Sequence, residues 1–425
     1  MVRWGRLRYP TPPDGDPMPH DTATRSENLR TGISLWTRTP NSTVTAERKL
    51  PEERFDVIVV GAGISGALVA EALTRAGKSV LIVDRRPPVR GSTPASTAMI
   101  LHEIDEPLIR LRRKIGDARA NAAWLRSAQS VGHLIDLTER LGIDCGMQRK
   151  PSLYLSGDEM GSRALQHEAD ARTAIGLDAE YLDRAALADR FGLDRPAAIL
   201  SSISASANPA QLAAGLLKAA LARKARLVSP VEISDMAELP GGVALATSDG
   251  AVLTAEHAVF STGYEFLPEM ESAAHRIVST WALASQPLSH LPAWLKETLV
   301  WEASDPYLYF RTDAAGRIIV GGEDENSSDS NSDPQKIGRK AKVIAGKFKT
   351  LTGIDLGRPA YAWGAPFGVT RDGLPIIDRV PGRERVFAIM GFGGNGITFS
   401  TIAAEIVAAE IAGRKDPDAD LFAYR

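Results

Sequence analysis

The segment that most constrains the fold is the glycine-rich sequence GAGISG, residues 61–66. It follows FDVIVV, an apolar and β-branched run that is typical of a strand buried on both faces. It precedes SGALVAEALTRAG, which has the apolar spacing of a helix, and KSVLIVD, a second buried strand that ends at Asp84. Strand, glycine turn, helix and strand in this order predict a βαβ unit that binds a dinucleotide.

Each position of the motif has a physical role in such a unit. Gly61 permits the tight turn, Gly63 lets backbone amides approach a pyrophosphate, and Gly66 allows close packing of helix on strand. The helix N-terminus supplies free N–H groups and a partial positive charge. Asp84 stands where an acid accepts hydrogen bonds from the adenosine ribose, which disfavours a 2′-phosphate and therefore NADP. The motif alone does not separate FAD from NAD.

A second glycine cluster, GFGGNG at residues 391–396, lies between the strand-like RVFAIM and an Ala/Ile-rich helical segment that should begin near Ile397 or Thr398. A nicotinamide cofactor has no general need for such a turn. A reduced flavin carries negative charge that a helix N-terminus stabilises, and glycines let the backbone approach its ring. We therefore predict that the two clusters bind opposite ends of one extended FAD. The alternative is an ordinary strand–helix turn.

Composition narrows the class of protein. A chain of 425 residues favours two domains, and a net charge of −2 with scattered Lys and Arg argues against a nucleic-acid partner. The single cysteine, Cys145, excludes internal disulfides, and the seven histidines show no paired metal-ligand spacing, so no metal site is predicted. No apolar run is long enough to span a membrane and no signal sequence is evident, so we expect a cytoplasmic location.

Signals of the nucleotide-binding domain recur along the chain and are interrupted by segments of another character. We predict an α/β fold in which a Rossmann-like FAD-binding domain carries an inserted α+β substrate domain with a mainly antiparallel sheet. The expected division is 51–145, 196–264 and 357–425 for the FAD-binding domain, 146–195 and 265–356 for the substrate domain, and 1–50 for an irregular N-terminal arm. The alternative for the arm is that the segment around Trp36 packs near the active site or a neighbouring subunit.

Three segments carry a resemblance to a known family: GAGISGALVAEAL with VLIVD, AVFSTGYE, and WGAPFGVTRDGLPIIDRV followed by VFAIMGFGGNGITFS. Over about residues 55–425 the chain resembles the D-amino-acid-oxidase-like superfamily of flavoproteins, which includes glycine oxidase, sarcosine oxidase and γ-glutamylputrescine oxidase. The resemblance implies noncovalent FAD, because these segments lack the cysteine or histidine that tethers the flavin in some relatives. The residues expected at the cofactor, from the motifs and the resemblance together, are Gly61, Gly63, Ile64, Ser65, Gly66, Asp84, Arg85, Ser92, Thr93, Ser96, Thr97, Val231, Thr262, Gly263, Gly391, Gly393, Gly394, Asn395, Gly396, Ile397 and Thr398.

The resemblance also places candidate residues on the substrate side. Tyr309 and Arg311 lie on a strand that lines the pocket in relatives, and Arg311 could bind a carboxylate or instead be a surface or structural arginine. Trp363 could wall the pocket or be a core residue, and His102, in a stretch expected to be helical, could accept a proton or be structural. Phe367 occupies the position of the carboxylate-binding arginine of glycine oxidase, which puts a carboxylate at this point in doubt.

The activity implied by the resemblance is oxidation of the C–N bond of an amine or amino acid by hydride transfer to FAD, giving an imine that water hydrolyses. The electron acceptor is oxygen or another carrier, and the sequence indicates neither this choice nor the oligomeric state. One alternative is a flavin-binding assembly or scaffold protein that has lost turnover. Another is an NAD-dependent dehydrogenase, which would leave the second glycine turn without a purpose.

Overall fold

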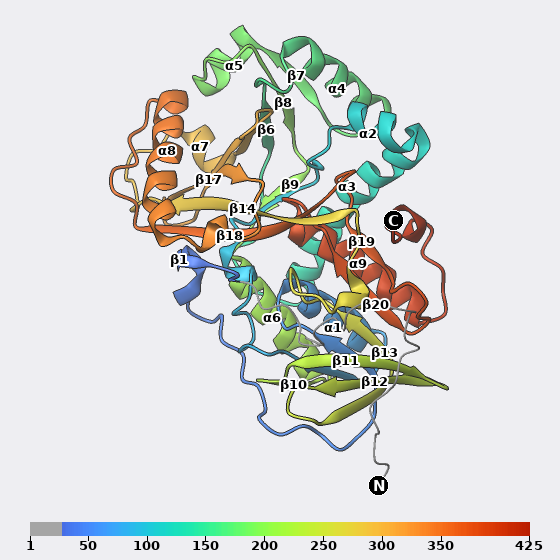
Figure 1. Ribbon diagram of the computed structural model, residues 1–425. Helices are drawn as coiled ribbons and strands as arrows, with labels where there is room; N and C mark the ends of the chain where they lie inside the picture. Colours follow the sequence, from blue (N-terminus) through green and yellow to red (C-terminus); the bar gives the residue numbers. More distant parts are fainter. Residues whose placement is uncertain (1–27) are drawn as a thin grey trace, which may run out of the picture.

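Two large β-sheets organise residues 28–425, the part of the chain that the computed structural model describes (Figure 1). One sheet has eight strands with a parallel centre, and the other has nine strands that are antiparallel at every pair but one. The predicted α/β fold, with a nucleotide-binding sheet and a mainly antiparallel second sheet, is confirmed.

The eight-stranded sheet contains the predicted βαβ unit. β2 (Phe55–Val60) and β3 (Val80–Val83) pair in parallel, and α1 (Ile64–Arg75) connects them. Val57 and Val59 of β2 pack with the core on the helical side, whereas Ile58 and Val60 pack in the opposite core, which explains the continuous apolar run. In spatial order the strands are β10 (Arg226–Val228), β3 (Val80–Val83), β2 (Phe55–Val60), β13 (Val252–Phe260), β12 (Gly242–Thr247) and β11 (Ile233–Leu239), with β20 (Val386–Met390) beside β13 and β19 (Ile376–Arg379) beside β20.

Three helices cover one side of this sheet. α1 packs against both α6 (Pro209–Ala222) and α9 (Gly396–Ile411). α6 begins at Pro209, and the Asn208 side chain accepts hydrogen bonds from the first-turn amides. The remaining helices are α2 (Leu108–Ile115), α3 (Asp117–Arg140), α4 (Ser162–Ala174), α5 (Arg184–Phe191), α7 (Ala293–Glu297) and α8 (Pro334–Thr352).

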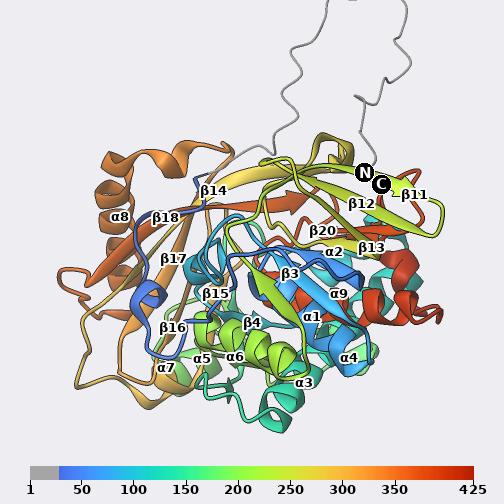
Figure 2. The same cartoon turned by 90° about the horizontal axis from the view of Figure 1, so that it is seen from below.

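The nine-stranded sheet has one face covered by α8, whose Phe348 meets Phe310 edge-on at a ring-centroid distance of 4.9 Å. Strand residues alternate between faces, so Tyr309 points away from α8. Figures 1 and 2 show β14 (His275–Ala284) and β18 (Tyr361–Thr370) of this sheet running beside α8. In spatial order the strands are β1 (Thr31–Ile33), β18 (Tyr361–Thr370), β14 (His275–Ala284), β17 (Ile318–Glu325), β16 (Leu308–Thr312), β15 (Leu299–Glu302), β6 (Ser152–Leu155), β8 (Ala197–Ser201) and β7 (Glu180–Asp183).

The expected domain division stays a prediction, and within its FAD-binding segments β8 and β18 pair in the nine-stranded sheet. Two other expectations from the sequence need correction. The arm is not irregular over residues 31–38, which form β1 and a short 3-10 helix, while its residues 1–27 lie outside the described part. The helical stretch expected from Thr97 begins with β4 (Met99–Leu101), which pairs with β9 (Ser204–Ser206), itself paired with β5 (Gln148–Arg149). A local sequence pattern predicts that a segment forms a strand, but it does not identify the distant strand with which that segment pairs.

Within residues 28–425, no helix is long and apolar enough to cross a membrane. The same residues hold no group of three or more His, Cys, Asp or Glu side chains placed to bind a metal ion.

Candidate active site

One continuous cavity joins the two glycine turns. It is lined by Gly61 and Gly63 before α1 and by Gly393 to Ile397 at the start of α9. It also reaches the nine-stranded sheet, where Tyr309 and Phe367 contribute to its wall. The cavity therefore lies between the two sheets and spans the full distance between the predicted halves of the site.

The N-terminus of α1 opens into this cavity. The helix begins at Ile64, and no side chain caps it at Gly63. A Cβ on Gly66 would lie 1.9 Å from the carbonyl oxygen of Gly61, so the turn and the helix are in contact through bare backbone. The Ile64 amide donates to Thr93 Oγ1 at 3.0 Å, which fixes the turn to the loop after β3. The first turn thus presents amide groups of the kind that bind phosphate.

The N-terminus of α9 stands beside that of α1. The Ser65 and Ser400 hydroxyls lie 2.7 Å apart and join the two helices. α9 begins at Gly396, one or two residues before the predicted start. Asn395 does not cap the helix, because its amide donates to the Glu103 carbonyl instead. Both helix N-termini therefore face one cavity, and at neither does the N-cap residue bind a first-turn amide with its side chain.

Asp84 stands at the end of β3, where the sequence predicted it. The amides of Ala62 and Arg86 each donate to its carboxylate at 2.7 Å, and burial raises its pKa. A carboxylate has about four lone-pair sites, so two remain for ribose hydroxyls. Arg86 forms a bidentate pair with Glu265 at 2.6 Å for both contacts, and Arg85 pairs with Glu232 and Glu265.

The loop at 91–97 is fixed by three buried side chains from distant segments. Trp363 Nε1 donates to the Ala95 carbonyl at 2.9 Å, and Trp36 Nε1 donates to the Ser96 carbonyl at 2.8 Å. Arg311 donates to the carbonyls of Thr97 at 2.7 Å and Ala207 at 2.8 Å. Trp36 thus packs at the candidate active site, the alternative left open by the sequence.

Three of the catalytic candidates are therefore misplaced. Arg311 and Trp363 are buried and do not line the cavity, so neither touches a substrate there. His102 is not helical: it follows β4, is fully buried, and its Nδ1 lies 2.7 Å from the Ile203 carbonyl. Burial lowers the pKa of His102, and the ring does not reach the cavity. Tyr309 and Phe367 do line it.

Most residues predicted at the cofactor line the same cavity. Val231 does so from the connection between β10 and β11, not from a strand as expected. Gly66, Gly391 and Thr398 lie behind the lining, and Thr398 Oγ1 donates to the Leu101 carbonyl at 2.8 Å. The predicted residues in the lining are Gly61, Gly63, Ile64, Ser65, Asp84, Arg85, Ser92, Thr93, Ser96, Thr97, Val231, Thr262, Gly263, Gly393, Gly394, Asn395, Gly396 and Ile397.

The polar residues of the cavity wall that sequence reasoning missed include Asp105, Thr280, Trp301 and Tyr307. A signal existed for Tyr307, because it stands two residues before Tyr309 and alternation puts both on one face. Asp105 had no such signal. Its Oδ2 accepts a hydrogen bond from the Gly394 amide at 2.7 Å, a contact between segments 289 residues apart.

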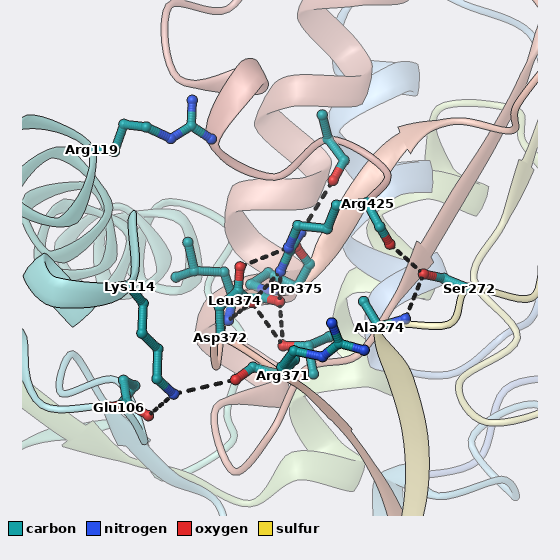
Figure 3. A network of polar contacts seen from close by, with 12 residues as sticks. Glu106, Lys114, Arg119, Ser272, Ala274, Arg371, Asp372, Leu374, Pro375 and Arg425 are labelled. Carbon is teal, nitrogen blue, oxygen red and sulfur yellow. Dashed lines mark hydrogen bonds and ion pairs between the residues drawn. The ribbon is translucent and has the colours of Figure 1, made fainter. Parts of the chain in front are cut away.

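A polar network fixes the loop that carries Asp105 (Figure 3). Lys114 binds the neighbouring Glu106 at 2.6 Å and the Arg371 carbonyl at 3.2 Å. In the same turn Asp372 pairs with Arg425 at 2.7 Å, so the last residue of the chain is bound to the Thr-x-Asp-Gly segment. The Lys114 contacts hold the Asp105 loop against this turn, which lies between β18 and β19.

The polar groups that line the cavity match the chemical groups of an FAD molecule. The Ser261 and Thr262 hydroxyls line it, are buried, and have no hydrogen-bond partner among residues 28–425. Such hydroxyl groups can hydrogen-bond to a polyhydroxylated chain. The two helix N-termini can bind a phosphate and a flavin, and the Asp84 carboxylate can bind a ribose. Gly61, Ser65 and Asp84 would hold the adenosine diphosphate part, and Gly394 to Ile397 the flavin.

Replacing Asp84 with Asn should raise the dissociation constant for FAD by roughly 10- to 100-fold, because an amide cannot accept both backbone N–H groups and the ribose. Fluorescence titration of the stripped protein with FAD measures this. Asp56→Asn is the control, since Asp56 also accepts a backbone amide, from Ser79 at 2.7 Å, but does not line the cavity. Equal effects of both variants would contradict a role for Asp84 at the cofactor.

Over most of its length the chain is similar to known amino-acid oxidases and to an amino-acid dehydrogenase. The chain is 23% identical to glycine oxidase of Geobacillus kaustophilus (strain HTA426), over 87% of this chain and 95% of that protein. It is 25% identical to N-methyl-L-tryptophan oxidase of Yersinia pestis (strain Pestoides F), over 87% and 98%. The crystal structure of the Geobacillus glycine oxidase superposes with a TM-score of 0.72 over 88% of this chain and 98% of that one, at 21% identity. L-proline dehydrogenase from P. horikoshii superposes with a TM-score of 0.73 over 88% and 97%, at 18% identity.

The profile of the family described as FAD dependent oxidoreductase (DAO) matches residues 56–410, which is most of the chain. With both glycine turns opening into one cavity within that range, the protein belongs to the DAO family of FAD-dependent oxidoreductases.

Proposed function

We propose that the protein oxidises the C–N bond of an amine or amino acid, using noncovalently bound FAD, and releases an imine that water hydrolyses. The observation that carries the proposal is the single cavity that runs from the two glycine turns to Tyr309 and Phe367 on the nine-stranded sheet. When bound there, FAD would supply the hydride acceptor.

The protein's own contribution is mainly placement. Tyr309 and Phe367 form part of the cavity wall on the nine-stranded sheet, which would orient a substrate and exclude water from the reacting carbon. The tyrosine is not suited to proton transfer near neutral pH, because burial raises its pKa well above the usual value. No acid or base is needed beyond loss of the ammonium proton before reaction.

The test is an anaerobic titration. The purified yellow protein is mixed with a panel of amines and D- and L-amino acids without oxygen, and bleaching of the flavin absorbance identifies a substrate. Admission of oxygen and detection of hydrogen peroxide then separates an oxidase from a dehydrogenase that uses another acceptor. A yellow protein that no amine bleaches would instead favour a flavin-binding scaffold.

Noncovalent attachment gives a separate prediction. The described part of the cavity wall contains no cysteine and no histidine, the residues that commonly link to a flavin in this superfamily. Precipitation with acid should therefore release all of the FAD into the supernatant, where its absorbance is measured. Yellow colour that stays with the precipitate through repeated washing would contradict this.

A further inference from the structure

We propose that the substrate end of the cavity recognises a cationic group, so that the preferred substrate is a diamine or similar amine with a second positive charge and no carboxylate. This inference rests on the proposed amine oxidation and specifies its substrate class. It is carried by the acidic-aromatic wall, which we define as Asp105, Asp324, Tyr307, Tyr309 and Trp301.

The charges of the cavity lining are distributed unevenly. Arg85 and Arg86 are the basic residues of the described lining, and both stand directly after β3 and are paired with acids. The part of the described lining that comes from the nine-stranded sheet contains neither Lys nor Arg. Phe367 stands there at the position that the resemblance to glycine oxidase gives to a carboxylate-binding arginine. A substrate carboxylate at this end would be desolvated without a cationic partner, which is unfavourable.

Two carboxyl groups adjoin the same end. Asp105 lines the cavity, and its Oδ2 is bound to the Gly394 amide at 2.7 Å. Asp324 lies behind Thr280 and Tyr307, and the hydroxyl groups of both residues adjoin it. Its buried Oδ1 nevertheless has no hydrogen-bond partner of normal geometry among the described residues. Burial raises the pKa of Asp324 to about 6, which leaves it mostly ionised at pH 7. Burial also raises the pKa of Asp105, and the charge of Asp105 raises that of Asp324. A cation bound beside these two carboxyl groups would stabilise their ionised forms.

Aromatic rings complete the wall. The Tyr307 and Tyr309 rings stack with centroids 5.5 Å apart and an interplanar angle of 30°. Trp301 also lines the cavity and is 8% exposed, yet its Nε1 has no hydrogen-bond partner within residues 28–425. This buried N–H can only donate, so it fits a water molecule or an acceptor atom of a ligand and not the ammonium group itself. Electron-rich ring faces beside carboxylates attract ammonium groups.

The test compares three amines of equal chain length that differ only at the far end: cadaverine, n-pentylamine and δ-aminovalerate. Binding to the protein with its flavin reduced beforehand, measured by calorimetry, reports affinity without turnover. Anaerobic bleaching of the oxidised flavin reports reaction separately. We expect cadaverine to bind roughly 10- to 100-fold more tightly than n-pentylamine, and δ-aminovalerate to bind most weakly.

Two variants locate the effect. Asp105→Asn and Asp324→Asn should each reduce the ratio of cadaverine affinity to n-pentylamine affinity by roughly 10-fold. Asp189→Asn, which changes the net charge equally but lies on the exposed surface of α5, should have no effect. Retained flavin content and melting temperature show that each variant is folded.

The outcomes separate this inference from the proposed function. Tightest binding of δ-aminovalerate, or a cadaverine preference that both cavity variants leave intact, would overturn the cationic substrate class while amine oxidation stands. If cadaverine binds best and loses its advantage in both variants, but no amine bleaches the flavin, the cation site stands and the proposed oxidation fails.

Discussion

Gly66→Ala is expected to leave the protein almost free of FAD and to destabilise it by about 3 kcal/mol or more. The added Cβ would lie 1.9 Å from the Gly61 carbonyl oxygen and 3.0 Å from its carbonyl carbon. Both are backbone atoms of the first glycine turn, so no side-chain rotation can relieve the overlap. The turn must shift, and the amides that would bind the pyrophosphate shift with it.

The measurement is the ratio of flavin absorbance at its visible maximum to protein absorbance after purification, together with the melting temperature with and without added FAD. Gly132→Ala is the matched control, because Gly132 also lies inside a helix but a Cβ there meets nothing within 4 Å. This control should be neutral or slightly stabilising, since alanine favours helix more than glycine does. A Gly66→Ala protein that keeps its FAD and its melting temperature would refute the assigned role of this turn.

The glycine turns were predictable because their signals are local. A strand, a turn and a helix within about thirty residues can be read from apolar spacing, and the conformation fixes where Gly61 and Asp84 must lie. The same holds for the N-cap of α6 at Asn208. For residues such as these, the neighbours that matter are close in the sequence.

The substrate side was less predictable because its contacts connect distant segments. Asp105 meets Gly394 across 289 positions and Trp36 meets Ser96 across 60, and no local pattern records such pairs. The sheet to which β8 and β18 belong could not be predicted either, because strand propensity does not identify the partner strand. Tyr307 is the exception, since its alternation with Tyr309 was visible in the sequence.

For Arg311 the predicted position on a strand near the cavity is correct, but the predicted contact with a substrate is not. It does stand on β16, one of the strands that reach the cavity, as the resemblance implied. Its side chain, however, is 2% exposed and lies 5.4 Å from the centre of the Trp36 ring. Burial lowers its pKa to about 10, so it remains protonated at neutral pH and donates to the two loop carbonyls.

Arg311→Met should therefore destabilise the protein by about 3–5 kcal/mol, because the carbonyls of Thr97 and Ala207 lose their charged donor in a buried setting. FAD should be retained less well, since Thr97 belongs to the loop that lines the cavity. Thermal unfolding and flavin content measure both effects.

The relative KM values for carboxylated and uncarboxylated amines distinguish this role from a carboxylate clamp. A clamp would raise KM for the carboxylated substrates alone and leave the melting temperature unchanged, whereas a loop anchor lowers the melting temperature and shifts both KM values alike. Arg184→Met provides the comparison, because Arg184 forms a 2.6 Å ion pair with Asp194 on the exposed surface, where such a pair contributes about 0–1 kcal/mol. A large loss of stability in the Arg311 variant, with almost none in the Arg184 variant, would show that Arg311 stabilises the loop. Only the loss of a buried donor leaves carbonyl groups without a hydrogen-bond partner.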